Sequence, residues 1–316
     1  MRIINLIENT EGRSGTDFEH GLSFYIETEN HKLLLDLGQT DKALSNATKL
    51  GIDLTKVDTM ILSHGHYDHS GGIMPFSRIN PAAAIYMQKS AAGEHYADDG
   101  EISNNSKEAD DGESVENVKS VDDGEAENNI KEASNNAKDT NEGTHARYRY
   151  IGIDKNILKL PQLKTIEGDL VIDDEIELFT IKKRSHKLPF TNKRLLIKTE
   201  NGFSPDDFCH EHFLVIKENG SSILLSGCAH NGILSILDAY KEKYGSFPDT
   251  VISGFHLMVK REYRENELRE VRDIAEKLNE LPVKYYTCHC TGLAAYEEMK
   301  KIMGEKLDYV HSCREL

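Results

Sequence analysis

The segment Ser63–Gly72, with the sequence SHGHYDHSGG, constrains this chain more than any other because it places three imidazoles and a carboxylate within six residues. Imidazole and carboxylate are the ligands of zinc, iron and manganese, and one loop of this kind can serve two adjacent ions. The flanking residues fit such a loop, since Thr59–Ser63 has the pattern of a short buried strand and Ser70–Gly72 that of a turn. The segment therefore predicts a metal site at the end of a strand.

The same segment resembles the HxHxDH signature of the metallo-β-lactamase superfamily, and further motifs follow in the order typical of that superfamily. They are a strand ending in an acidic residue, a strand followed by Cys-Ala-His, and a C-terminal strand followed by His, at Leu33–Gly38, Ile223–His230 and Tyr285–Gly292. EHGLS, SGCAH, SGFHL and HCTG are similar to the branch named after 7,8-dihydropterin-6-yl-methyl-4-(β-D-ribofuranosyl)aminobenzene 5′-phosphate synthase. The resemblance covers nearly the whole chain except one insert. It implies an α/β fold of four layers, the αββα sandwich.

Strand and helix patterns in the sequence favour the same architecture. Apolar strand-like segments occur in two β-rich halves, each of which also contains helical patterns. Helices are predicted over residues 40–50, 232–244, 263–281 and 294–302, the first with Thr40 as N-cap. Two such halves suit two sheets packed face to face with helices outside. We expect a single metallo-β-lactamase-like domain over residues 1–316.

An acidic insert interrupts this domain over residues 98–142. It contains three copies of a 12-residue unit, at 101–112, 113–124 and 125–136, and too few apolar residues to bury a face, which predicts disorder. The insert holds 15 acidic residues and 4 lysines, so it carries −11 of the net charge of −16 and leaves −5 for the rest. A mildly acidic remainder offers no basic surface, so we expect no nucleic-acid partner.

Composition also indicates where the protein works. The chain has an odd number of cysteines, five, which argues against a disulfide framework and for a reducing compartment. No run of 18 apolar residues is present, and the N-terminus leads directly into a strand-like segment. We therefore expect a cytoplasmic protein without a membrane partner.

The resemblance implies two metal ions and a ligand set for each. The ligands expected for the first ion are His64, His66 and His230, and those for the second are Asp68, His69 and His289. In the superfamily the later strand commonly ends in Gly-Asp, and that Asp bridges the metals, whereas here Cys228 follows Gly227. Cys228 is either a further ligand or a small buried residue beside the site. His212 is the alternative third ligand of the first ion if His230 is not one.

Four further residues are candidates for roles around the metals. Asp68 would also accept a hydrogen bond from a metal-bound hydroxide, and His256, which follows the strand-like residues 250–253, is either a catalytic histidine or a structural one. Glu19 and His20 precede an N-terminal strand and are candidates for the mouth of the site. Asp36 is expected to orient a ligand histidine rather than to bind metal.

These residues predict a class of reaction. Two ions about 3.5–4 Å apart lower the pKa of a bridging water to near 7 and stabilise negative charge on an attacked or departing oxygen. We expect a hydrolase or transferase with zinc, or with iron or manganese, that acts on a phosphorylated or pterin-like small molecule. The alternatives are a phosphodiesterase or nuclease, a lactonase, or a non-catalytic metal or ligand sensor, which would bind without turnover.

Overall fold

The computed structural model describes residues 1–100 and 147–316. The chain divides into two compact units, one of residues 1–97 with 150–316 and one of residues 98–149. The predicted acidic repeat of residues 98–142 lies outside the described residues from residue 101 onward. The two large sheets and the candidate site belong to the first unit.

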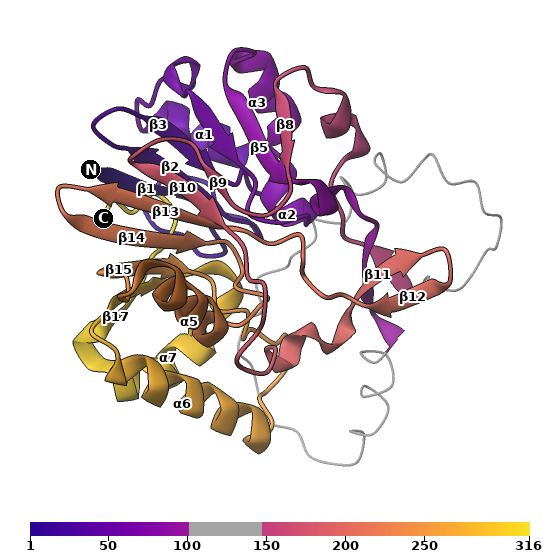
Figure 1. Cartoon of the computed structure of the whole chain (residues 1–316), viewed down its shortest axis with the longest axis vertical. Helices are drawn as coiled ribbons and strands as arrows, with labels where there is room; N and C mark the ends of the chain where they lie inside the picture. The colour runs from indigo at the N-terminus through magenta and orange to yellow at the C-terminus, as the bar shows by residue number, and fades with distance from the viewer. Residues whose placement is uncertain (101–146) are drawn as a thin grey trace. The chain divides into compact units, whose positions relative to one another are not determined.

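Two mixed sheets form the centre of this unit (Figure 1). The first has the strand order β1-β2-β3-β4-β5-β8, with β1 Arg2–Ile7, β2 Ser23–Glu27, β3 Lys32–Leu35, β4 Thr59–Ile61, β5 Ala84–Gln88 and β8 Leu163–Ile166. The second has the order β17-β16-β15-β14-β13-β10-β9, with β9 Leu170–Val171, β10 Ile176–Phe179, β13 Phe213–Glu218, β14 Ser221–Ser226, β15 Thr250–Ser253, β16 Lys284–Thr287 and β17 Leu307–Tyr309. In each sheet an antiparallel part adjoins a parallel part, which begins at β3 in the first sheet and at β14 in the second.

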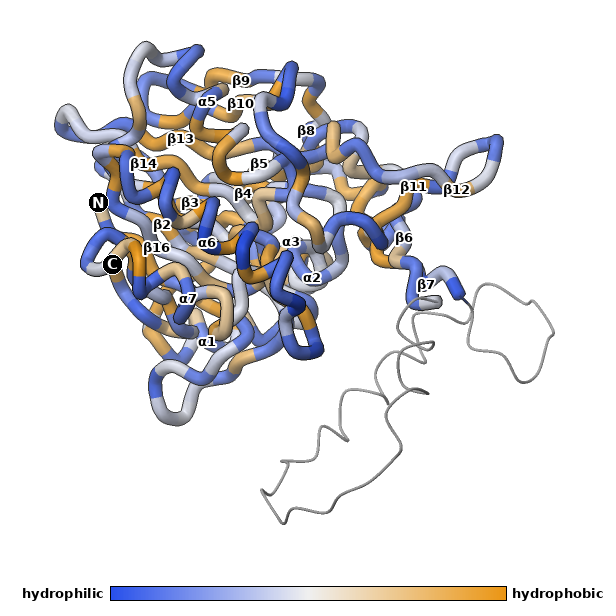
Figure 2. The backbone as a smooth tube through the Cα atoms, turned by 90° about the horizontal axis from the view of Figure 1, so that it is seen from below, coloured by the Kyte–Doolittle hydropathy of each residue, from blue (hydrophilic) through white to orange (hydrophobic). Residues whose placement is uncertain are grey.

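The two sheets pack face to face because apolar side chains alternate between the faces of each strand. Leu33 and Leu35 of β3 share a buried cluster with Leu214 of β13 and Leu225 of β14, between the sheets. Leu34 points the other way, into a cluster that contains residues of the helices on the outer face. Figure 2 shows the strands largely in the hydrophobic colour and α6 largely in the hydrophilic one.

Helices cover both outer faces of the pair of sheets. The first sheet packs against α1 (Lys42–Lys49) and α3 (Ile73–Ile79). The second packs against α5 (Ile233–Tyr244), α6 (Glu265–Glu280) and α7 (Leu293–Met303). The order helix, sheet, sheet, helix confirms the αββα fold predicted from the sequence.

Several short elements were not predicted. They are α2 (Tyr67–Ser70), α3 and the strands β6 His95–Asp98, β7 Tyr148–Tyr150 and β12 Gly202–Pro205. These strands form a smaller sheet of order β12-β11-β6-β7 with β11 Leu195–Thr199, whose sequence does have the pattern of a strand. Such elements are too short to show a period, so tertiary pairing decides them. Over residues 1–100 and 147–316, no helix is long and apolar enough to cross a membrane.

Candidate metal centre

The predicted ligands gather where parallel strands end together. Leu35 of β3 pairs with Ile61 of β4, and Ser253 of β15 pairs with both Ser226 of β14 and Thr287 of β16. Because parallel strands in register end at the same edge of a sheet, the loops that follow them emerge side by side. These loops carry the histidines of the site: His64, His66 and His69 after β4, His230 after β14, His256 after β15 and His289 after β16.

The backbone is strained at the same loops. Asp36, Ala229, His256 and His289 have φ of 58°, 49°, 51° and 48°, in the left-handed region that residues other than glycine rarely adopt. Such a conformation costs on the order of 1–3 kcal/mol and persists only where the surroundings hold it. Each of these residues lies in a loop directly after a strand, so the sheets hold the site loops in sharply turned conformations.

Two imidazoles face each other with unprotonated nitrogens. The Nε2 atoms of His64 and His230 are 3.3 Å apart. Ser63 Oγ donates to Asp36 Oδ2, so it accepts from Nδ1–H of His64. Asn192 donates from Nδ2 to the His230 carbonyl, so its Oδ1 accepts from Nδ1–H of His230. Both Nε2 atoms therefore carry lone pairs, and neither can donate to the other.

That separation fits a cation between the two rings. Two nitrogens bound at about 2.0–2.1 Å to one tetrahedral ion lie about 3.3–3.4 Å apart. Both residues are buried, at 0% exposure for His64 and 1% for His230. Two facing lone pairs that water does not reach repel each other unless a positive ion lies between them.

Gly227 shows how closely this part of the site is packed. A Cβ atom at Gly227 would lie 2.2 Å from Ser63 Oγ and 3.1 Å from Asp36 Oδ2. Gly227 therefore leaves room for the hydrogen bonds from Ser63 to Asp36 and from His64 to Ser63, which fix the His64 ring. Any larger residue would displace it.

His66 lies beside this pair and also adjoins a second buried network. Its ring centroid is 4.6 Å from that of His64 and 4.8 Å from that of His230. His66 Nε2 is buried without a hydrogen-bond partner among the described residues, and it belongs to a group with His95, Asp206 and His210 whose ligand atoms lie within 4.8 Å of one another.

Asp206 organises that second network. Its Oδ2 accepts from His95 Nδ1 at 2.7 Å and from His210 Nε2 at 3.3 Å. His210 Nδ1 accepts from the Gly65 N–H at 3.0 Å, so the proton of this ring sits on Nε2. This network connects the loop that carries His64 and His66 to residues that the sequence did not single out, His95 and Asp206.

The second predicted ligand set also comes together. Asp68 Oδ2 lies 3.4 Å from His289 Nε2 and 3.8 Å from His69 Nε2, and the His20 Nε2 atom lies 3.3 Å from it. His69 donates from Nδ1 to Asp36, and His289 from Nδ1 to Asn9, which orients both Nε2 atoms toward Asp68. Burial acts to raise the pKa of Asp68, but the neighbouring imidazoles outweigh it and hold that pKa well below its usual value.

Cys228 lies between the two sets. Its Sγ belongs to a group with His64 and His230 and also to a group with His69 and His289, each within 4.8 Å. The Sγ atom is 3.1 Å from His69 Nε2. Burial raises the pKa of the Cys228 thiol well above its usual value, so the thiolate forms here only with a cation to stabilise it.

His256 lies in the loop after β15, with one ring nitrogen held by Thr191. Thr191 Oγ1 donates to the His256 carbonyl and accepts from Nδ1–H at 2.7 Å, which leaves Nε2 as an acceptor. The ring centroid lies 4.1 Å from that of His230. Burial lowers the pKa of His256 to about 3, so the ring is neutral at pH 7.

Sequence reasoning missed the residues that fix the ligand loops. Glu8 accepts from the N–H of His289 at 3.0 Å, and Glu211 accepts from the N–H of His230 at 2.8 Å. Asn9 and Asn192 each bind both the ring and the carbonyl of one histidine. The polar pair Glu8-Asn9 directly after the apolar strand β1 was the one sequence signal that could have pointed to the residues that hold His289.

Two candidate site residues, Glu19 and His212, form hydrogen bonds with groups outside the ligand sets. The Glu19 carboxylate accepts from the N–H groups of Gln39 and Thr40 and from the Thr40 hydroxyl, so it holds that turn in place. His212 donates from Nε2 to the Leu62 carbonyl at 2.8 Å, and its Nδ1 lies 3.3 Å from Gln88 Nε2. His212 has both nitrogens engaged, whereas His230 has a free one.

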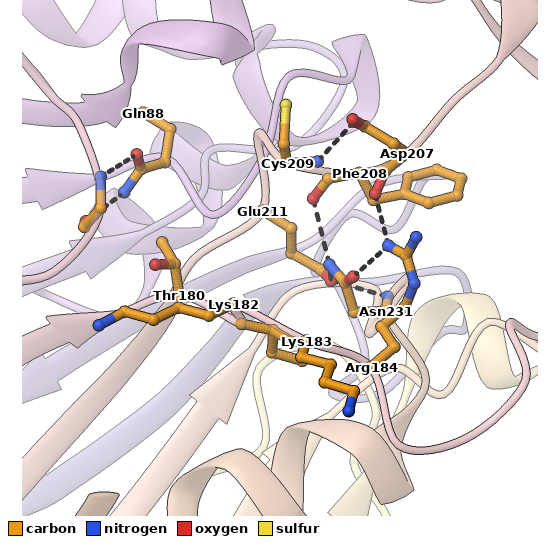
Figure 3. A pocket seen from close by; sticks show the side chains of 12 residues that line it. Gln88, Thr180, Lys182, Lys183, Arg184, Asp207, Phe208, Cys209, Glu211 and Asn231 are labelled. Atoms are coloured by element: carbon orange, nitrogen blue, oxygen red, sulfur yellow. Dashed lines mark hydrogen bonds between the residues drawn. The ribbon is translucent and has the colours of Figure 1, made fainter.

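Two pockets adjoin the ligand loops. One of about 280 Å³ lies beside His289 and is lined by Met258, Tyr263 and Leu293 among others. The other, of about 470 Å³, lies between the segment after β10 and the loop before β13 (Figure 3). Its wall includes Asn231, the neighbour of His230 in the chain.

Comparison with known proteins agrees with this geometry. The family model of the metallo-beta-lactamase superfamily matches residues 16–134, which include the whole His-Asp segment. Over these residues the chain is similar to the metallo-β-lactamase superfamily. A crystal structure of a metal-dependent hydrolase of the β-lactamase superfamily superposes with a TM-score of 0.73 at 25% identity, over 100% of this chain and 98% of that one.

Two relatives of the chain come from Methanocaldococcus jannaschii. The chain is 26% identical to 7,8-dihydropterin-6-methyl-4-(beta-D-ribofuranosyl)-aminobenzene-5'-phosphate synthase, over 99% of this chain and 95% of that protein. It is 24% identical to an uncharacterized protein over 90% of this chain and 88% of that protein. The chain is thus similar over nearly its full length to a pterin-related synthase and to a metal-dependent hydrolase of the same superfamily.

Proposed function

We propose that this protein is a dinuclear metal-dependent hydrolase or transferase that acts on a phosphorylated or pterin-like small molecule. The observation that carries the proposal is the set of buried imidazoles at the strand ends. His64, His230, His69 and His289 each donate from Nδ1 to a fixed acceptor, which orients each Nε2 toward the other candidate ligands. An arrangement of this kind fits cations and fits little else in a buried site.

The described residues divide into two ligand sets. We assign His64 and His230 to the first ion together with His66, whose ring lies beside theirs, and Asp68, His69 and His289 to the second. The Cys228 sulfur groups with His64 and His230 and also with His69 and His289. Two divalent ions in such a site supply a water of lowered pKa and positive charge for an attacked or departing oxygen. Zinc suits these donors best, and iron and manganese share them.

The surrounding residues would contact the substrate. Thr191 fixes His256 with Nε2 as an acceptor, so we assign to His256 a contact with a hydrogen-bond donor of the substrate. His20, 43% exposed and 3.3 Å from Asp68, is placed to contact substrate at the edge of the site. The pocket beside His289, with Met258, Tyr263 and Leu293, suits a flat apolar ring.

The test is the metal content of the purified protein by elemental analysis, for the wild type, His64→Ala and His289→Ala. We expect close to two ions per chain in the wild type and a loss in each variant. His186→Ala is the matched control, because His186 pairs with Asp238 on the surface away from both ligand sets. One ion lost only with His64→Ala would overturn the dinuclear assignment.

Turnover then separates an enzyme from a sensor. Phosphate esters and pterin diphosphates are the first substrates to screen with the metal-loaded protein. Product formation that disappears in His64→Ala supports catalysis. A protein that retains both ions and binds these compounds without product would be a sensor.

A further inference from the structure

The larger pocket has no part in the ligand sets described above. It encloses about 470 Å³ between the segment after β10 and the loop before β13, and Thr180, Lys182, Arg184, Cys209 and Asn231 are among the residues that line it. Figure 3 shows Arg184 directed toward Asp207 and Asn231, with Glu211 beside Asn231. Its lining combines fixed polar groups with positive charge.

Positive charge is concentrated here in an otherwise acidic chain. Lys182, Lys183 and Arg184 are consecutive, all three are exposed, and all three line the pocket, although the chain has a net charge of −16. None of the three has a carboxylate within ion-pair distance among the residues that the structure describes. Unpaired cations grouped in a concave surface attract anions more strongly than the same cations on a flat surface.

Arg184 is held in place by neutral acceptors. Its Nη1 donates to the Asp207 carbonyl at 2.6 Å and to Asn231 Oδ1 at 3.0 Å. Asn231 is itself fixed, because its Nδ2 donates to the Phe208 carbonyl and to the Glu211 carboxylate. The guanidinium is thus pre-oriented but keeps its whole charge, which is the condition for recognition of phosphate oxygens.

The acidic groups of the pocket wall are already engaged. Glu211 accepts from the N–H groups of His230 and Asn231 and from the Asn231 side chain. Asp207 Oδ1 accepts from the N–H of Cys209. These bonds orient the two carboxylates without removing their charge, but three cations outnumber them, so the field inside the pocket is positive.

We propose that this pocket is an anion subsite that binds a phosphate or diphosphate group. The anion has two sources, the phosphate end of the enzyme's own substrate or a free inorganic phosphate or diphosphate. The assignment to the substrate rests on the proposed function, whereas anion binding itself does not.

Cys209 provides a direct probe of occupancy. It is exposed and lines the pocket, whereas Cys228, Cys288 and Cys290 are buried and Cys313 is partly buried elsewhere. The full-length protein is alkylated with N-ethylmaleimide, an uncharged reagent, with and without pyrophosphate, and each cysteine is followed by mass spectrometry. At a pyrophosphate concentration ten times Kd, we expect the Cys209 rate to fall about tenfold while the Cys313 rate stays unchanged.

Variants identify the groups that hold the anion. The double variant Lys182→Ala/Lys183→Ala should lose the protection, whereas Lys187→Ala, a matched change at an exposed lysine of the same segment outside the pocket, should keep it. His64→Ala should also keep it. Absence of protection in the wild type, protection that survives the double variant, or protection lost in His64→Ala would each overturn the proposal, the last by placing the anion on the metals.

Kinetics distinguish the two sources of the anion. If the substrate supplies it, the double lysine variant should raise KM for a phosphorylated substrate about tenfold or more, with kcat and the KM of the dephosphorylated analogue unchanged. If a free anion supplies it, neither KM changes while pyrophosphate still protects Cys209. A protein without turnover contradicts the proposed function but leaves the protection result standing.

Discussion

At the scale of single residues, the site depends on groups that never touch a metal. One hydrogen bond at Nδ1 decides that the opposite nitrogen of an imidazole is free to bind. Asp36 has a wider role than any other such group, because its Oδ2 accepts both from Ser63, which supports His64, and from His69. One carboxylate thereby orients a ligand of each set.

The two asparagine contacts allow the ligand sets to be tested separately. Asn192→Ala removes the support of His230, so we expect the affinity for the first ion to fall about 10–100-fold with the second little changed. Asn9→Ala removes the support of His289 and should have the converse effect. Competition titration with a chromophoric chelator measures both affinities.

Asn156→Ala serves as the control, because Asn156 lies at an exposed position in a short helical turn far along the chain from either ligand loop. Equal losses at both ions in Asn192→Ala and in Asn9→Ala would contradict the division into two sets.

At the scale of elements, α6 illustrates how one ion pair anchors a helix that carries no ligand. Glu267 in its first turn receives two bonds from Arg261, at 2.7 and 2.8 Å, and a third from the N–H of Arg264. The Arg261 guanidinium, followed by the Arg264 N–H, lowers the pKa of Glu267 to about 2 from its usual 4.5. The side chain of Glu267 is only 8% exposed, so water screens the pair weakly from its side.

This shift predicts an acid-sensitive contribution to stability. A lowered folded-state pKa stabilises the protein at pH values above 4.5, and the contribution is lost as the pH falls from 4.5 through 2. We expect Glu267→Gln to reduce the free energy of unfolding by about 2 kcal/mol at pH 7, a figure discounted because Arg261 is partly exposed. Urea denaturation across pH 2 to 7 should show wild type and variant converging at the acid end.

Glu276→Gln, an exposed change on the same helix, should unfold like the wild type throughout. A difference between the wild type and Glu267→Gln that stays constant down to pH 2 would mean that the charge of Glu267 is not its source.

At the scale of the whole molecule, the residues that flank the acidic repeat contact each other directly. The Asp99 N–H donates to the Arg147 carbonyl at 2.9 Å, and Arg147 pairs with Asp98. Residues on either side of the segment 101–146 are therefore already hydrogen-bonded to each other.

We predict that replacing residues 101–146 by a four-residue Gly-Ser linker leaves the melting temperature and the metal content unchanged. The reason is the scarcity of apolar residues in this segment, which leaves it little to contribute to a core. Calorimetry and elemental analysis of the two proteins decide the matter. A lower melting temperature together with lost metal would refute the prediction.

Some parts of the fold and of the site were predictable from the sequence, and others depend on contacts between distant residues. The His-Asp segment and the strand patterns predicted the αββα layers, because ligand chemistry and the alternation of apolar residues are local signals. The grouping of His95 and Asp206 with His66 was not predictable, since β6 and the loop before β13 are 111 residues apart in sequence at their contact. Thr40 was predicted as the N-cap of α1, but the N-cap is Asp41. The Thr40 hydroxyl donates instead to Glu19, a contact between distant residues that the local sequence does not indicate.

The dependence of His289 on Glu8 and Asn9 has a consequence for biosynthesis. Glu8 and Asn9 are synthesised 281 and 280 residues before His289, so the proposed second ligand set cannot form until His289 has left the ribosome. At about 5–20 residues per second, the 59 positions from His230 to His289 separate the completion of the two sets by several seconds. In the proposed dinuclear site, the first ligand set is therefore complete before the second.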